Sequence, residues 1–213
     1  MASTFGFIQS AGSTWARRGT RGMPLAWIAS AGEGGARETD WRSARDRGLV
    51  TTCGPDNVGA PSEGIPLHGT YVFLRAEEVR SARRDDEVVC QAAVRDTRGL
   101  RIERTIRTRP GEGRVGLTDR AVNSSDAPLK APLLYHVKLG WPLWDLGARV
   151  ETNASKVIAH DTDAEPDDRR AAPSTAQEPE RVWKHIAATC ASVTNDRPDL
   201  KVTIESDLPR LWQ

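Results

Sequence analysis

The sequence has few cysteines and no apolar run long enough to cross a membrane. Cys53, Cys90 and Cys190 are far apart, odd in number and form no Cys-x-x-Cys pair. This spacing argues against a zinc site and against a disulfide framework, and it predicts three reduced, mostly buried thiols. The first residues also lack a basic segment followed by an apolar segment, so they contain no secretory signal. We therefore expect a cytoplasmic protein.

The chain also lacks an excess of charge of either sign. Lys and Arg total 30, Asp and Glu total 29, and the formal net charge is +1. Such a balance gives no overall field that would favour nucleic acid or an anionic membrane. The basic residues are nearly all arginines that alternate with acids, which we interpret as compositional bias rather than a phosphate site. We expect neither nucleic acid nor membrane as a partner.

Several motifs of enzyme chemistry are absent. The sequence contains no Gly-x-Ser-x-Gly elbow, no Walker-type phosphate loop and no His-Glu-x-x-His helix. No group of His, Cys and acidic residues has the sequence spacing of metal ligands. The pairs Asp85–Asp86 and Asp167–Asp168 are typical of a solvated surface. The sequence accordingly predicts no metal and no cofactor.

What the chain does contain is a series of short runs with β-type periodicity. Residues 87–94 form a short apolar run, and apolar and polar residues alternate in 101–108, 114–122 and 201–206, which is typical of half-buried antiparallel strands. Links rich in turn-forming residues, such as 109–113 and 123–128, separate them. Amphipathic helices are scarce, so we expect an all-β sandwich or barrel of one domain over residues 1–213. The polar segment 160–180 is predicted to be a flexible loop.

Among the four histidines, His68 ends a long irregular stretch, residues 51–69, that is rich in Gly, Pro, Asn and Asp. A long loop in a compact domain is often functional, and Gly69 allows a ligand or another backbone to approach closely. The alternative is a loop histidine that is hydrogen-bonded to a carbonyl group. The local pattern leaves both open.

The second candidate, His136, follows the apolar run 133–135, which predicts a strand that positions it. Trp141 and Trp144 follow it, and sugar pockets combine such aromatic faces with polar side chains. Both tryptophans could instead be ordinary core residues. His185 fits either a ligand carried by a strand or a surface position, and His160 is assigned no role.

Two segments resemble a bacterial branch of the aldose 1-epimerase-like (galactose mutarotase-like) proteins. They are residues 49–59 with 67–69, and residues 134–149, in the same order. Residues 21–27 and 208–212 also resemble this branch. The resemblance implies an antiparallel β-sandwich with a sugar bound across one concave sheet. It also implies a reaction in which the α and β anomers of an aldose interconvert through acid–base ring opening.

The resemblance implies roles for individual residues. His136 matches the histidine that protonates the ring oxygen, and His68 matches the histidine that binds a hydroxyl and polarises the ring. Further sugar contacts are expected at Asn57, Gly69, Asp145, Trp141 and His185.

The chain also departs from the family pattern. Thr70 occupies a position that is often Arg in this branch. The catalytic Glu of the family lies on a strand beyond the segment that matches 208–212, and Glu205 lies upstream of that place. We therefore expect the chain to be truncated at its C-terminal end, without the general base and the last strands.

Three hypotheses follow from the sequence. The chain is an isomerase that acts on a small sugar, a non-catalytic sugar-binding module, or an inactive fragment. The sequence indicates neither which sugar is bound nor the oligomeric state.

Overall fold

A computed structural model describes residues 2–11, 25–27, 49–160, 181–208 and 210–212, with the backbone alone for 2–11 and 210–212. Over these residues the chain is built of β-strands and one short 3-10 turn, η1 (Tyr71–Phe73). The strands are β1 (Ala2–Ala11), β2 (Val50–Cys53), β3 (Glu77–Arg84), β4 (Glu87–Arg95), β5 (Leu100–Thr108), β6 (Arg114–Asn123), β7 (Leu134–Val137), β8 (Ala148–Thr152), β9 (Lys156–Ala159), β10 (Trp183–Ile186), β11 (Cys190–Asn195), β12 (Leu200–Ser206) and β13 (Arg210–Trp212).

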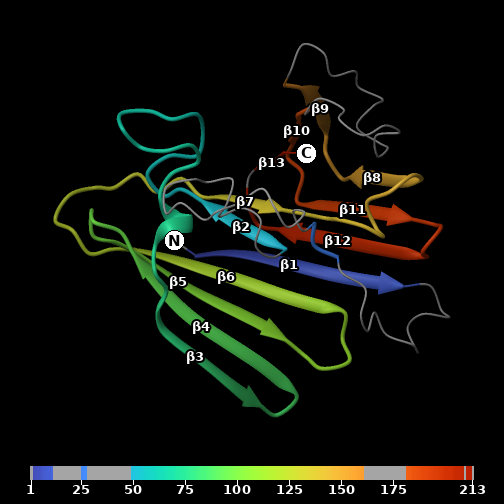
Figure 1. The fold of residues 1–213 in the computed structure, drawn as a ribbon, viewed down its shortest axis with the longest axis horizontal. Coiled ribbons are helices and arrows are strands. Elements are labelled where there is room, and N and C mark those ends of the chain that lie inside the picture. The colour runs from blue at the N-terminus through green and yellow to red at the C-terminus, as the bar shows by residue number, and fades with distance from the viewer. Residues whose placement is uncertain (1, 12–24, 28–48, 161–180, 209, 213) are drawn as a thin grey trace, which may run out of the picture.

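Eight strands form one antiparallel sheet, in the order β3-β4-β5-β6-β1-β12-β11-β8 (Figure 1). The apolar run 87–94 corresponds to β4, and the three alternating runs correspond to β5, β6 and β12, so these predicted strands are confirmed. The sequence analysis did not predict β1, which lies between β6 and β12 and pairs with both. Residues from the two ends of the described chain therefore meet in the middle of the sheet.

The main core lies on one face of this sheet. In β12 burial alternates along the strand, so Leu200, Val202 and Ile204 point inward. They pack in one cluster with Leu117 of β6 and Val193 of β11. Each such side chain contributes about 1.5–3 kcal/mol through removal of its apolar surface from water. The period-two pattern of the sequence thus directly determines which side chains build the core.

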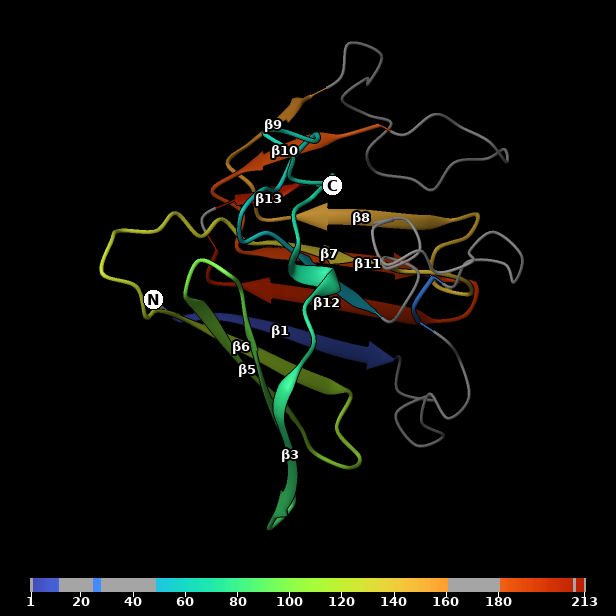
Figure 2. The ribbon, with the colours of Figure 1, turned by 60° about the vertical axis from the view of Figure 1, so that its left-hand side comes forward.

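A separate two-stranded ribbon, β2 paired with β7, covers this core (Figure 2). Val50, Tyr135 and Val137 of the ribbon pack against the core cluster of the large sheet. The strand predicted to position His136 is confirmed as β7. This ribbon, together with the loop that follows β2, carries the candidate site.

The edge strand β3 differs from the other strands of the large sheet in its exposure to solvent. All eight residues of β3 are exposed, and no strand was predicted there from the sequence. An exposed edge strand has no apolar face, so period-two alternation cannot reveal it. Its charged side chains also oppose edge-to-edge association with other sheets.

A three-stranded sheet, β13-β10-β9, completes the described fold. β10 contains His185, whose side chain is only 2% exposed. The surface position considered for His185 is therefore wrong, because the residue lies on a buried strand. Of the segment predicted to be a flexible loop, only His160 is among the described residues. It is exposed, and its N–H donates to the carbonyl oxygen of Val182.

The described chain is thus all-β and antiparallel, and it is consistent with the expected β-sandwich. Within its described ranges there is no helix that could cross a lipid bilayer.

Candidate functional site

The pairing of β2 with β7 determines which side chains share a face of the ribbon. Thr51 is opposite His136, and Thr52 is opposite Tyr135. Neighbours along a strand point to opposite faces, and paired residues share a face. Because Tyr135 reaches the large sheet, Thr51, Cys53 and His136 belong to the other face of the ribbon. Cys53 and His136 are diagonal neighbours there.

The loop after β2 brings His68 to the same place. Residues 54–70 leave the end of β2 and return to it: Gly54 N–H donates to the His68 carbonyl oxygen at 3.0 Å. Tyr71 N–H donates to the Gly54 carbonyl oxygen at 2.7 Å. Two backbone hydrogen bonds therefore hold His68 beside Cys53, although the two residues are 15 positions apart in the sequence.

Internal hydrogen bonds make this loop a defined structure. The Asp56 carboxylate accepts from Thr70 N–H at 2.9 Å and from the Thr70 hydroxyl at 2.7 Å. The amide nitrogen of Asn57 lies 2.8 Å from the carbonyl oxygen of Ala60 and 3.3 Å from that of Pro66. Thr70, where the family often has Arg, thus serves to close the loop. The amide of Asn57 is engaged inside the loop, and its contact with a sugar stays a prediction.

The two candidate histidines meet. The ring centroids of His68 and His136 are 5.0 Å apart, with 69° between the ring planes. Both side chains are half-buried. The Nδ1 atom of His68 lies 3.4 Å from the Val58 carbonyl oxygen. Since a carbonyl can only accept, His68 donates through Nδ1 in the tautomer that makes this hydrogen bond, and Nε2 then has acceptor character. The pair can therefore both donate to and accept from hydroxyl groups.

Gly69 allows the loop to close next to His68. Its φ is +78°, and a Cβ there would lie 2.5 Å from Asp56 Oδ1 and 2.7 Å from the Gly54 carbonyl oxygen. Gly64 has the same φ of +78°, but nothing lies within 4 Å of its Cβ position. The two glycines thus share one backbone conformation and differ in packing.

This pair provides a matched test of the loop. We expect Gly64→Ala to cost about 1 kcal/mol, the strain of a left-handed residue. Gly69→Ala is expected to cost about 3 kcal/mol or more, because strain and overlap with backbone add. Urea denaturation of both variants measures the difference. Equal costs would mean that the loop does not pack on Gly69 as described.

Below the ribbon, a buried ion pair joins it to the large sheet. The guanidinium of Arg104 donates to both carboxylate oxygens of Asp119, at 2.8 and 2.6 Å, and to the Thr52 hydroxyl at 2.6 Å. The Tyr135 hydroxyl donates to the same carboxylate at 2.7 Å. The Asp119 side chain is only 1% exposed, and that of Arg104 is 19% exposed. The bond from Tyr135 holds the strand that carries His136 against the sheet.

Burial and the ion pair between Arg104 and Asp119 shift the pKa values of several nearby groups. Burial acts to lower the pKa of Arg104, but its hydrogen bonds to Asp119 outweigh this effect, and the pKa lies above its ordinary range. Burial raises the pKa of Tyr71 to about 12, although the Arg104 charge opposes this. Burial, the charge of Asp119 and the hydrogen bond to it raise the pKa of Tyr135 as well. Arg104 stays charged and both tyrosines stay neutral over a wide range of pH.

An alkaline titration tests this arrangement, because the chain has just two tyrosines. Between pH about 10 and about 12 the unfolded chain loses its tyrosine protons while the folded chain keeps that of Tyr71. Stability should therefore fall as pH rises through this window. We expect little tyrosinate absorbance from the folded protein at pH 10. Normal titration of both tyrosines with native circular dichroism would contradict the burial described.

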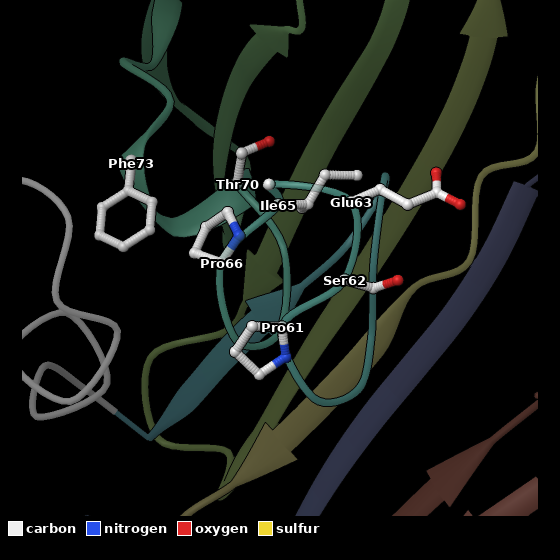
Figure 3. Close-up of a pocket in the computed structure, with 8 residues that line it drawn as sticks. Pro61, Ser62, Glu63, Ile65, Pro66, Thr70 and Phe73 are labelled. Atoms are coloured by element: carbon white, nitrogen blue, oxygen red, sulfur yellow. The ribbon is translucent and has the colours of Figure 1, made fainter.

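Two hollows lie near these residues. A cavity of about 330 Å³ between ribbon and sheet is lined by Val50, Thr51, Thr52, Tyr71, Val72, Leu74, Ala76, Ala92, Ala93, Val94, Ile102 and Arg104. A larger, mainly apolar hollow of about 640 Å³ lies within the loop, where Figure 3 shows Pro61, Pro66 and Phe73 among its lining residues. Neither His68 nor His136 is among the described residues that line the two hollows. The chemistry of the site therefore depends on the histidine pair rather than on either hollow.

The other predicted sugar contacts differ in burial and in their local partners. Trp141 is 67% exposed, which rules out its reading as an ordinary core residue, whereas Trp144 is half-buried and packs against the main core. Asp145 is exposed, and its carboxylate accepts from Leu146 N–H. Buried His185 lies with its Nδ1 atom 2.9 Å from the Thr152 hydroxyl oxygen. This burial argues against direct contact of His185 with a sugar.

Sequence reasoning missed Cys53, Arg104 and Asp119 as neighbours of the site. A signal did exist for the last two. Arg104 lies between Ile102 and Ile106, and Asp119 follows Leu117 at the same period-two spacing, so both charges fall on inward-facing positions. An inward-facing charge needs a partner, and the register of β5 with β6 places these two opposite each other.

Comparisons with known proteins agree with this fold. A family profile described as "Domain of unknown function (DUF4432)" matches residues 14–211. No curated protein matches the sequence. A solved structure from Klebsiella pneumoniae subsp. pneumoniae MGH 78578, described as a "putative aldose 1-epimerase", is similar with a TM-score of 0.66 and 23% sequence identity. The similarity covers 77% of this chain and 49% of that one, so this chain spans about half the length of that protein.

Proposed function

We propose that this chain, which belongs to the DUF4432 family and has an aldose 1-epimerase-like fold, binds a small sugar at His68 and His136 and interconverts its anomers. One observation carries the proposal. Two histidines that are 68 positions apart in the sequence have ring centroids only 5.0 Å apart. The fold places them on a ribbon and a loop that are both held by backbone hydrogen bonds.

The chemistry needs one proton delivered and one removed. His136 protonates the ring oxygen while His68 hydrogen-bonds a hydroxyl of the sugar. The bond between C1 and the ring oxygen breaks as the C1 hydroxyl loses its proton and becomes a carbonyl. Rotation about the bond from C1 to C2, followed by the reverse steps, gives the other anomer. No atom is gained or lost.

Solvent water accepts the C1 proton, because the nearby carboxylates are engaged by other groups. Of the nearby acids, Asp119 is engaged by Arg104 and Tyr135, and Asp56 is engaged by Thr70. Among the described residues, no carboxylate joins the cluster that contains the two histidines. This observation favours a second candidate function, a sugar-binding module that does not catalyse conversion.

One experiment separates the two candidates. The rate at which α-glucose and α-galactose reach anomeric equilibrium is measured by polarimetry and NMR, with a chelator present and with buffer alone as the reference. Tryptophan fluorescence during sugar titration reports binding. Conversion faster than in buffer supports the enzyme. A fluorescence response without faster conversion supports the binding module. Circular dichroism checks that the protein is folded. If the folded protein shows neither faster conversion nor a fluorescence response, both candidates are wrong for these sugars.

A further inference from the structure

Cys53 lies with the two histidines of the proposed sugar site. One ligand atom from each of Cys53, His68 and His136 can be chosen so that all three lie within 4.8 Å of one another. Neither the thiol nor its closeness to the imidazoles is needed for the acid–base chemistry proposed above. A thiol and two imidazoles at this separation are a set of ligands for a transition-metal ion.

We propose that Cys53, His68 and His136 form a site for Zn²⁺ or a similar divalent transition-metal ion. Sulfur and imidazole nitrogen suit zinc, whereas Mg²⁺ and Ca²⁺ prefer oxygen ligands. Around a tetrahedral zinc ion, such ligand atoms are about 3.3–3.6 Å apart. Starting from separations of at most 4.8 Å, small side-chain rotations suffice to reach this geometry.

The backbone holds all three ligands before any metal binds. Cys53 and His136 are fixed by the register of β2 with β7. His68 is tied to the residue after Cys53, since Gly54 N–H donates to its carbonyl oxygen. Preorganised ligands on such elements lower the cost of binding. Sequence spacing could not show this cluster, because the three residues lie on two strands and a loop.

The coordination is expected to have an open position. Cys53 has no exposed surface and the Nε2 atom of His136 is buried, whereas His68 and His136 are half-buried as whole residues, so the histidine side is the more open approach to the site. Three protein ligands leave a fourth position for water or a small ligand. A nitrogen that binds the metal cannot deliver a proton to a sugar, so metal on the ring nitrogen that faces the sugar blocks the proposed conversion. Zinc is thus expected to inhibit any conversion.

Cobalt provides a direct test that does not depend on sugar. The full chain, washed with chelator and kept reduced, is titrated with Co²⁺. We expect the visible absorption bands of four-coordinate cobalt and a near-ultraviolet charge-transfer band from the thiolate to the cobalt ion. Added Zn²⁺ should displace cobalt and remove both signals. Cys53→Ser should abolish the thiolate band, whereas Cys90→Ser and Cys190→Ser should retain it.

Affinity and folding controls keep the test decisive. Mutation of a residue that only hydrogen-bonds to a metal ligand typically lowers metal affinity by roughly 10–100-fold. Cys53→Ser and His136→Gln remove a ligand itself, so each should lower metal affinity by more than this. Circular dichroism checks that both variants fold. A thiolate band that is absent from the wild type, or that persists in Cys53→Ser, would overturn the proposal. Sugar conversion in chelator is measured separately, so failure of the metal site is distinguishable from failure of the proposed function.

Discussion

His136→Ala is expected to lower the rate of anomer conversion by about 10²–10⁴-fold, the usual contribution of one general acid. The imidazole of His136 meets that of His68, so alanine leaves no group to protonate the ring oxygen. Polarimetry of α-galactose in the presence of chelator measures the effect. If the wild-type chain binds sugar without converting it, the same variant should lose the fluorescence response to sugar.

His160→Ala is the matched control for this prediction. His160 is exposed, and its described hydrogen bond uses the backbone, which alanine preserves. His136→Gln tests whether hydrogen bonding alone sustains activity, because glutamine keeps polarity but cannot deliver a proton in the same way. Equal losses in His136→Ala and His160→Ala would show that the site is wrongly assigned.

The second large effect is expected at the buried ion pair. Removing one partner of such a pair commonly costs about 3–5 kcal/mol, because the other charge stays buried without compensation. Asp119→Asn and Arg104→Met should each lower the free energy of unfolding by about this amount. In Asp119→Asn the Tyr135 hydroxyl also loses its charged acceptor. Urea denaturation monitored by circular dichroism measures both.

A double variant separates the pair from its parts. Replacing both charges, as Arg104→Met with Asp119→Leu, leaves no uncompensated charge, so its cost should be well below the sum of the single costs. The exposed pair Arg149–Asp196, whose side chains are 55% and 69% exposed, is the surface control. Asp196→Ala should shift the urea midpoint far less. Additive single and double costs would mean that Arg104 and Asp119 do not act as a pair.

Several features of the fold were predictable from local pattern. The strands β5, β6 and β12 show period-two alternation because one face of each packs on the core, and β4 was predicted from its apolar run. Strands without that pattern were missed. β3 is exposed throughout, and β1 is defined by its partners on both sides. The resemblance to aldose 1-epimerase-like proteins indicated the fold that the Klebsiella structure shares.

The candidate site was predictable only in part. The sequence singled out His68 and His136, and it also suggested His185 and Asn57 as further sugar contacts. Burial at 2% exposure separates His185 from solvent, and the loop itself engages the amide of Asn57. The burial of His185 and the hydrogen bonds of Asn57 depend on which strand is buried and on how the loop closes. The residue types alone do not determine either.

By itself, the sequence determined that the chain is all-β, where several strands run and which two histidines merit attention, because alternation and turn residues act locally. Only the tertiary structure decided which distant side chains meet. The register of β2 with β7 and the return of the loop to Gly54 place Cys53 beside both imidazoles. The register of β5 with β6 sets Arg104 opposite Asp119. Strand pairing is a long-range choice, and it is this choice that turns separate residues into a site.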